Sequence, residues 1–189
     1  MTENVDIWII PRGEPNETVS ELGHMWMSWW DSSAKHREHR GYYYALEKLP
    51  PEIRKAGTQA INNFLFSNAT PGVYRRDLYA KNMEQLYHSF CKTHRLFFCD
   101  SKFRTLVASC DIPRGQNEKE EGLYSFATND CTESLEWNNC VSWVGKRINN
   151  ICEQTSIQIP SPARIKTMHN EWSDRITNEC IEKNDGTPC

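Results

Sequence analysis

Apolar residues recur at every second position in the first part of the chain, and this period predicts β-strands. Val5–Ile10 is a short β-branched run that Pro11 and Gly13 end, so we expect a strand there. Residues 24–30 also alternate, with His24, Trp26, Ser28 and Trp30 on one face and Met25, Met27 and Trp29 on the other. Because both faces carry bulky side chains, we expect this segment to be a central strand.

The next segments extend this sheet and interrupt it once with a helix. Residues 31–39, DSSAKHREH, are expected to be a polar loop, and residues 41–47 a second strand antiparallel to the first. A helix is expected over residues 51–66, since the proline at its start is tolerated in a first turn. Residues 71–79 are expected to form another short strand.

Helical spacing is clearer in the second half of the chain. Residues 101–110 have apolar side chains at helical intervals, and residues 115–122 are expected to be a charged surface loop. In residues 138–154 an apolar stripe with period near 3.6 predicts a helix, and Asn138 or Asn139 is a suitable N-cap. A last helix is expected over residues 163–181.

These elements predict an α+β fold in which an antiparallel sheet packs against helices. The chain has 189 residues, enough for one domain with a sizeable core, and shows no internal repeat or low-complexity linker. We expect one domain over residues 1–165, with residues 166–189 as its C-terminal helix and tail.

Charge and composition exclude several classes of partner. The formal net charge is −3, which gives no electrostatic reason to expect nucleic acid or a membrane surface as a partner. No window approaches the roughly 18 continuous apolar residues of a membrane span. The start MTENVDIWIIPRG lacks the basic region of a secretory signal, so we expect the eight cysteines to be reduced thiols. The expected location is the cytoplasm, or a host cytosol after export without a cleaved signal.

One cysteine lies where a thiolate is favoured. Cys140 directly follows the expected cap of the helix over residues 138–154. Backbone N–H groups and the positive end of the helix dipole meet at such a position and stabilise the anion. A nucleophilic cysteine also needs a base within hydrogen-bond distance and a group that orients the base. The histidine that begins the Trp/Met-rich strand, His24, is the candidate base.

These motifs resemble those of the circularly permuted papain-like hydrolases, a group that includes lecithin–retinol acyltransferase and relatives of NlpC-type amidases. The resemblance rests on GHMWMSWW and GYYY followed far downstream by NNCVSWV, with PGVYRRD and YSF between them. It spans roughly residues 5–165 and implies a permuted papain-like fold, with Cys140 as nucleophile and His24 as base. In that family a polar residue on the next strand holds the imidazole. The strand itself offers only tyrosines, so His39, just before it, is assigned this role.

The resemblance implies acyl transfer through a Cys–His pair, without cofactor or metal. Water as acceptor would give an amidase, peptidase or deamidase, and an amine or hydroxyl would give a transferase. The expected substrate is a protein, peptide or other amide, and the chain could act as an exported bacterial effector on a host protein. The alternative is a catalytically silent module of the same fold that recognises a partner protein through an aromatic groove.

Other interpretations of these residues, without catalysis by Cys140 and His24, stay open. His24 alone could be a structural histidine, and Cys140 alone an inert buried thiol, since cysteine is among the most buried residue types. Cys131 is a competing nucleophile, although no helix begins at it. A separate alternative is a zinc site in HSFCKTHRLFFC, whose candidate ligands are His88, Cys91, His94 and Cys99.

Overall fold

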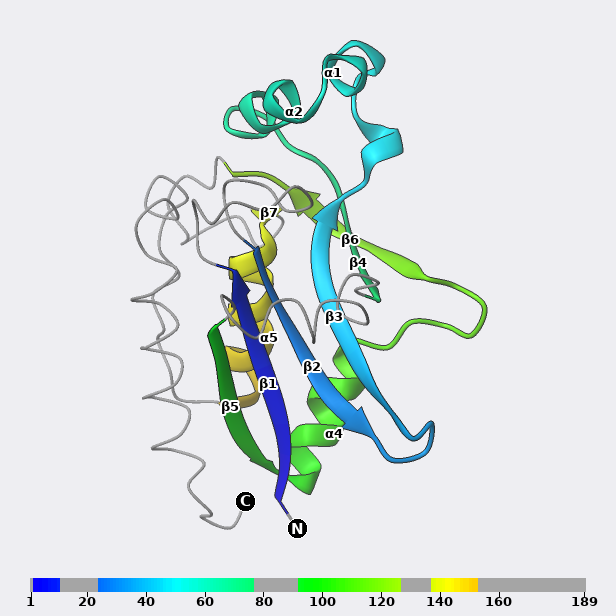
Figure 1. The fold of residues 1–189 in the computed structure, drawn as a ribbon, viewed down its shortest axis with the longest axis vertical. Coiled ribbons are helices and arrows are strands. Elements are labelled where there is room, and N and C mark those ends of the chain that lie inside the picture. Colours follow the sequence, from blue (N-terminus) through cyan, green and yellow to red (C-terminus); the bar gives the residue numbers. More distant parts are fainter. Residues whose placement is uncertain (1, 11–23, 77–91, 127–136, 153–189) are drawn as a thin grey trace.

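A seven-stranded sheet is the centre of the computed structural model, which describes residues 2–10, 24–76, 92–126 and 137–152. The strand order is β5-β1-β2-β3-β4-β6-β7, and all neighbours are antiparallel except β6 and β7 (Figure 1). The strands are β1 (Thr2–Ile10), β2 (His24–Asp31), β3 (His36–Tyr44), β4 (Thr70–Arg76), β5 (Lys92–Cys99), β6 (Glu118–Tyr124) and β7 (Trp137–Asn138).

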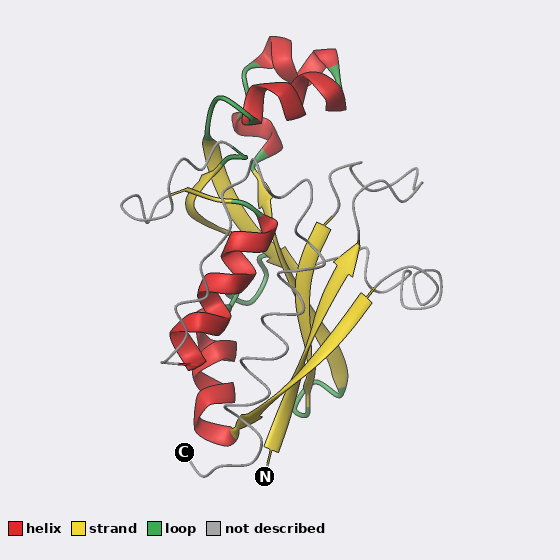
Figure 2. Cartoon of the chain, turned by 90° about the vertical axis from the view of Figure 1, so that its left-hand side faces the viewer, coloured by secondary structure: helices red, strands yellow, loops and turns green. Residues whose placement is uncertain are grey.

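Helices lie on one face of the sheet and beyond one end of it. They are η1 (Leu46–Lys48, a 3₁₀ turn), α1 (Pro51–Ala56), α2 (Thr58–Leu65), α4 (Asp100–Ser109) and α5 (Cys140–Cys152). Figure 2 shows α4 and α5 along the same face, whereas α1 and α2 project past the end of the strands. This arrangement confirms the α+β class. None of the helices in the described ranges has the length and apolar character needed to cross a bilayer.

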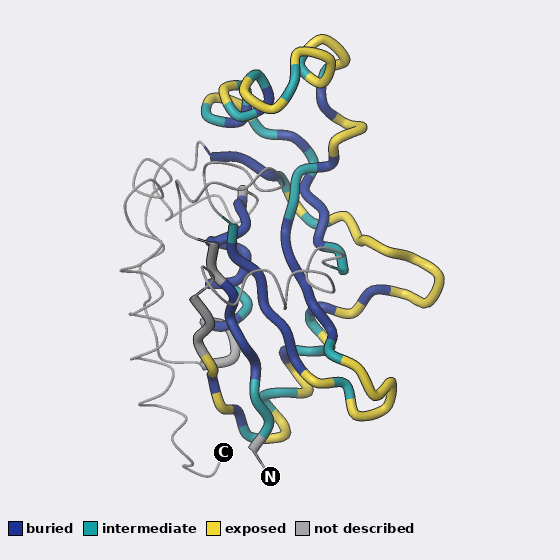
Figure 3. The backbone as a smooth tube through the Cα atoms, viewed as in Figure 1, coloured by how far each residue is buried: buried dark blue, intermediate teal, exposed yellow. Residues whose placement is uncertain are grey.

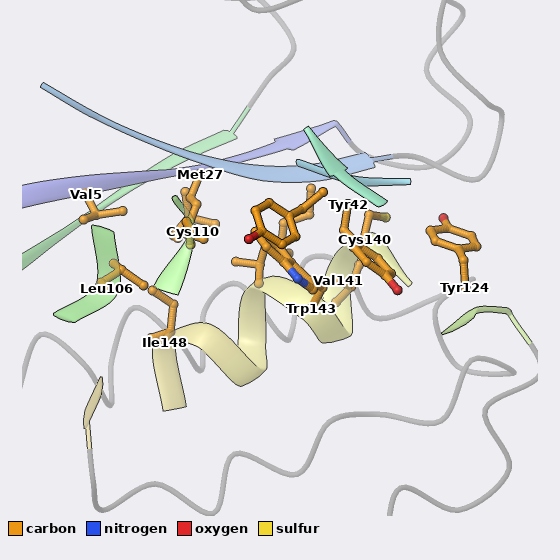
Figure 4. Packing of buried hydrophobic residues seen from close by; sticks show 14 of the residues in the cluster. Val5, Met27, Tyr42, Leu106, Cys110, Tyr124, Cys140, Val141, Trp143 and Ile148 are labelled. Atoms are coloured by element: carbon orange, nitrogen blue, oxygen red, sulfur yellow. The ribbon is translucent and has the colours of Figure 1, made fainter. Parts of the chain in front are cut away.

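The central position predicted for residues 24–30 is confirmed, because β2 lies between β1 and β3. Met25 and Met27 are fully buried in the hydrophobic core, and α5 packs over β2 and β3. Figure 3 shows the middle of the sheet as buried backbone. From α5, Val144 and Ile148 of the predicted apolar stripe are also fully buried. Figure 4 shows Ile148 among the side chains of this core. On the opposite face Trp26 is 2% exposed, so both faces of β2 are covered.

Strand β3 begins earlier than the sequence predicted. The polar loop expected over residues 31–39 is only a four-residue turn, and His36–Arg40 already pair with β2. The charged side chains of this segment find partners within the sheet: Arg37 donates to Asp6 at 2.7 Å, and Arg40 pairs with Glu38. Ion pairing therefore lets a segment that looks like a loop in the sequence run as a strand.

Other boundaries also differ from the expectations. The single helix expected over residues 51–66 is broken at Gly57, whose φ of 92° lies outside the helical region. The charged segment expected to be a surface loop, residues 115–122, includes most of β6, which pairs with β4 although its first residues are exposed. The sequence did not predict β5, whereas α4 is confirmed. The last helix over 163–181 and the tail over 166–189 lie outside the described residues.

Hydrogen bonds connect the end of α2 to the residues that follow β6. The amide of Phe126 donates to the Leu65 carbonyl at 2.8 Å, and the Ser125 hydroxyl donates to the carbonyls of Leu65 and Asn68. These bonds fix the last turn of α2 directly beside Tyr124, the final residue of β6.

Candidate active site

Cys140 is the first residue of α5, and its position is fixed by the cap that precedes it. The Asn139 side-chain oxygen accepts the N–H groups of Val141 at 3.0 Å and Ser142 at 2.9 Å. In return the Ser142 hydroxyl accepts the Asn139 N–H at 2.9 Å. This reciprocal pair satisfies first-turn amides that have no partner within the helix. The sequence left Asn138 and Asn139 open as caps, and the structure selects Asn139.

The sulfur of Cys140 meets the side chain of His24, which is the first residue of β2. Burial raises the pKa of the Cys140 thiol. A side-chain hydrogen bond and the charge of His24 act in the opposite direction, as do the backbone N–H groups of Met25 and Val141. Together they outweigh burial and hold the pKa below its ordinary value. The structure thus brings the two residues singled out in the sequence into one hydrogen-bonded pair, with a thiol disposed to ionise.

Tyr124 contributes a hydroxyl to this site (Figure 4). Its side chain hydrogen-bonds with Cys140, and its ring lies among Tyr42 at 5.5 Å, Tyr44 at 5.7 Å and Phe126 at 5.6 Å between centroids. Burial above all, and then the charge of the Cys140 thiolate, raises the pKa of Tyr124 well above its ordinary value. The phenol therefore keeps its proton and is a donor toward the sulfur.

The partner of the imidazole is Tyr43 on β3, and this corrects the assignment of His39. The Tyr43 hydroxyl lies 2.8 Å from Nε2 of His24, and the two ring centroids are 4.9 Å apart. His39 instead pairs in register with Ser28, and its Nδ1 accepts the indole N–H of Trp26 at 3.3 Å. The reason is strand register: His39 lies four residues before Tyr43 on β3, so it lies beside the middle of β2 and not beside the end that carries His24.

Aromatic side chains extend from His24 across the sheet. The imidazole stacks on Trp26 with centroids 5.5 Å apart, and Trp26 stacks on Trp8 of β1 at 5.8 Å and 6°. The indole of Trp8 also donates to the Ser28 hydroxyl at 2.8 Å. This row of rings supports one side of the imidazole, so the Trp-rich run belongs to the surroundings of the site.

Two other cysteines whose side chains are described differ from Cys140. Cys110 is a free, buried thiol whose pKa is raised, chiefly by burial. Cys99 is disulfide-bonded, so the expectation that all eight cysteines are reduced is wrong for this residue. The disulfide also removes Cys99 from the zinc alternative. The side chains of the other three candidate zinc ligands lie outside the described parts of the chain. The competing nucleophile Cys131 also lies outside them.

Comparison with known proteins finds no family model that matches the chain, and no similar curated protein or solved structure. The interpretation of the site therefore rests on its own geometry. Sequence reasoning found Cys140 and His24 but missed Tyr43, Tyr124 and the Met25 amide. The tyrosines of GYYY were visible as polar groups on the neighbouring strand, whereas nothing in the sequence indicated that Tyr124 faces the sulfur.

Proposed function

We propose that this protein is a thiol-dependent acyl-transfer enzyme, a hydrolase of amides such as an amidase, peptidase or deamidase. The observation that carries the proposal is the environment of the Cys140 sulfur. An imidazole from β2 and backbone N–H groups from two elements meet at the start of α5 and lower the pKa of a buried thiol. Perturbed pKa values of this kind, produced by a specific partner against the effect of burial, concentrate at functional sites.

In the first half of the reaction the Cys140 thiolate attacks the carbonyl carbon of the substrate, and a C–S bond forms as the carbonyl oxygen becomes an oxyanion. Because Tyr43 occupies Nε2, we assign Nδ1 of His24 as the nitrogen that faces the sulfur. The imidazolium gives its proton to the leaving nitrogen, and the C–N bond breaks to leave a thioester. The Cys140 amide, a first-turn N–H without an acceptor in its own helix, and the Tyr124 hydroxyl are donors that we assign to the oxyanion.

The second half restores the thiolate and the imidazolium. His24 removes a proton from water as it attacks the thioester carbonyl, and the C–S bond breaks to release a carboxylic acid and the Cys140 thiolate. The imidazolium is formed again in the same step, so the pair returns to its starting state. An amine or hydroxyl acceptor would follow the same path and give a transferase.

The order of these elements supports the permuted papain-like assignment as part of the proposal. The strand with the histidine precedes the helix with the cysteine in the chain, and an antiparallel sheet packs against that helix. A third residue, on the strand beside His24, contacts the imidazole as the family pattern requires, although here it is a tyrosine.

Site-specific alkylation tests the proposal without knowledge of the substrate. At about pH 6.5 we expect iodoacetamide to modify Cys140, because the thiolate is the reactive form, and to leave the fully buried Cys110 unmodified while the protein stays folded. Mass spectrometry of the digested protein reads both sites in one sample, so Cys110 reports whether a variant remains folded. His24→Gln should slow the modification of Cys140 at least roughly tenfold while Cys110 stays unmodified and the far-UV circular dichroism stays unchanged.

A second readout separates a reactive thiol from a catalytic one. The wild-type protein should release nitrophenol from p-nitrophenyl acetate in a burst and then in a steady phase, whereas Cys140→Ser should show neither. Equal alkylation of Cys140 and Cys110, or an unchanged rate in His24→Gln, would contradict the proposal.

The alternative of a silent binding module is favoured by one observation, the low exposure of Cys140, of which 6% is accessible. A substrate must reach this sulfur, so a folded protein that resists both iodoacetamide and the acetate ester would be assigned to this alternative. The two proposals therefore predict opposite results in the same experiment.

A further inference from the structure

The phenol whose hydroxyl contacts His24 packs against two residues, one on its own strand and one on the neighbouring strand. On β3 the ring of Tyr43 leans back over Gly41, and Gly41 pairs in register with Arg75 of β4. The Arg75 guanidinium lies 3.9 Å from the centre of the Tyr43 ring. The phenol is thus held between a cation on one strand and the backbone of its own strand, with its oxygen 2.8 Å from Nε2 of His24.

Resting on the proposed function, we propose that Arg75 and Gly41 are positioning residues that act through Tyr43 to fix the orientation of the His24 ring and its affinity for a proton. Neither residue makes a described contact with Cys140. Their influence on the nucleophile therefore depends on the Tyr43 hydroxyl as an intermediary.

The sign of the Arg75 effect follows from the roles of the Tyr43 oxygen. Toward neutral His24 the phenol donates its proton to Nε2, and toward the imidazolium it must accept one. A cation over the ring draws electron density from it, which makes the phenol a better donor and a poorer acceptor. The positive charge of Arg75 also opposes the imidazolium directly. Both effects lower the proton affinity of His24 and leave a base that releases its proton more readily.

The charge of Arg75 is available for this role. Among the described residues Arg75 has no ion pair, whereas the adjacent Arg76 lies 3.5 Å from Glu38. The titratable groups shown in contact with His24 are Cys140 from α5 and Tyr43 from β3. Tyr124 from β6 lies behind the sulfur, and Arg75 from β4, whose register partner on β6 is Glu118, lies behind the phenol. Arg75 is the one permanent cation in this set.

Gly41 supplies the space that the phenol needs. A Cβ atom at this position would come within 2.8 Å of the Tyr43 oxygen and 2.9 Å of its Cε2 atom. Real side chains do not approach this closely, so an alanine must push the phenol away from its place. Because Arg75 covers the ring from the neighbouring strand, the displacement would weaken the hydrogen bond to His24.

The titration of His24 tests the proposal independently of catalysis. We would label the histidine rings with ¹³C at the ε1 position, follow their NMR signals with pH, and assign His24 from the His24→Gln spectrum. Arg75→Gln should raise the pKa of His24 by about 0.3–0.7 unit. Arg75→Lys, which keeps the charge, should restore most of the wild-type value, and Gly41→Ala should also shift the titration.

A double-variant comparison and a matched control complete the experiment. In a Tyr43→Phe background Arg75→Gln should have less than half of its original effect, because the hydroxyl that transmits it is gone. Arg76→Gln removes the same charge at the next residue and should leave His24 unchanged. An unchanged His24 titration in Arg75→Gln, or an equal shift with and without the Tyr43 hydroxyl, would overturn the inference. A shifted titration in a protein whose Cys140 does not react would support this inference and contradict the proposed function.

Discussion

Asn139 and Ser142 cap each other's backbone in the turn that carries Cys140, with the two hydrogen bonds between them both at 2.9 Å. The Asn139 side chain also holds the amide of Val141 at 3.0 Å, next to the sulfur. Cys140 lies between these two residues, so its backbone cannot turn without breaking the cap. The cap thus determines where the thiol points, and the sequence that specifies it is four residues long.

Asn139→Ala should lower the free energy of unfolding by about 1 kcal/mol, since first-turn amides lose their acceptor. The variant should also alkylate more slowly at Cys140, because the sulfur is no longer held against the Met25 amide. Urea unfolding and iodoacetamide labelling measure the two effects. Asn63→Ala, on the exposed surface of α2, is the control and should change stability by less than about 0.5 kcal/mol. A cap variant with wild-type labelling would show that the first turn is held by other contacts.

Tyr124→Phe should raise the pKa of Cys140, because the thiolate loses a hydrogen-bond donor while the ring and its packing stay. We expect alkylation at neutral pH to slow by roughly three- to tenfold and the midpoint of its pH profile to move upward. Tyr74→Phe is the matched control, since that buried hydroxyl donates to the Asp111 carbonyl at 3.0 Å. If both variants alkylate alike, Tyr124 does not serve the sulfur.

Tyr43 and His39 can be distinguished by paired substitutions. Tyr43→Phe should change the pH profile of Cys140 alkylation, because Nε2 of His24 loses its partner. His39→Ala should leave that profile in place but destabilise the protein by about 1–3 kcal/mol, because the buried Trp26 indole loses its acceptor. The reverse result would return the orienting role to His39.

Glu38 should make stability depend on pH in the acid range. Burial raises the pKa of its carboxyl, but Arg40, His36 and Arg76 outweigh burial, and the pKa lies below its ordinary value. The stabilisation from this carboxylate is therefore present above the pKa of the unfolded chain, 4.5, and is lost as the pH falls through the folded value. His36, whose pKa is raised chiefly by its hydrogen bond to Glu38, has the opposite dependence near neutral pH.

Glu38→Gln should be about 1–3 kcal/mol less stable than the wild type at pH near 6, since Arg40 loses a buried anionic partner. Between about pH 5 and about pH 3 the wild type should lose stability faster than the variant. Urea unfolding across this range measures both curves. Glu118→Gln, at the exposed start of β6, should follow the wild type. Parallel curves for Glu38→Gln and the wild type would contradict this account.

The sequence predicted the elements in which apolar side chains recur with the period of a strand or a helix. It failed where ion pairs between strands or the register of the strands decide the structure. β2 and α5 were found because apolar periodicity is strong in both, and the cap before Cys140 follows from local chemistry. The strand at His36–Arg40 was missed because its charges are neutralised by Asp6 and by Glu38 within the sheet. Tyr43 was passed over for His39 because register, which places one of them beside His24, is not encoded in the spacing of either residue.

Strand β2 presents the imidazole of His24 and the amide of Met25 to a sulfur that the chain reaches only after the whole sheet has been laid down. In an unfolded or partly synthesised polypeptide Cys140 is consequently an ordinary thiol, because the groups that stabilise its thiolate are not beside it. Folding therefore activates the cysteine, and loss of tertiary structure would inactivate it without any change in covalent structure.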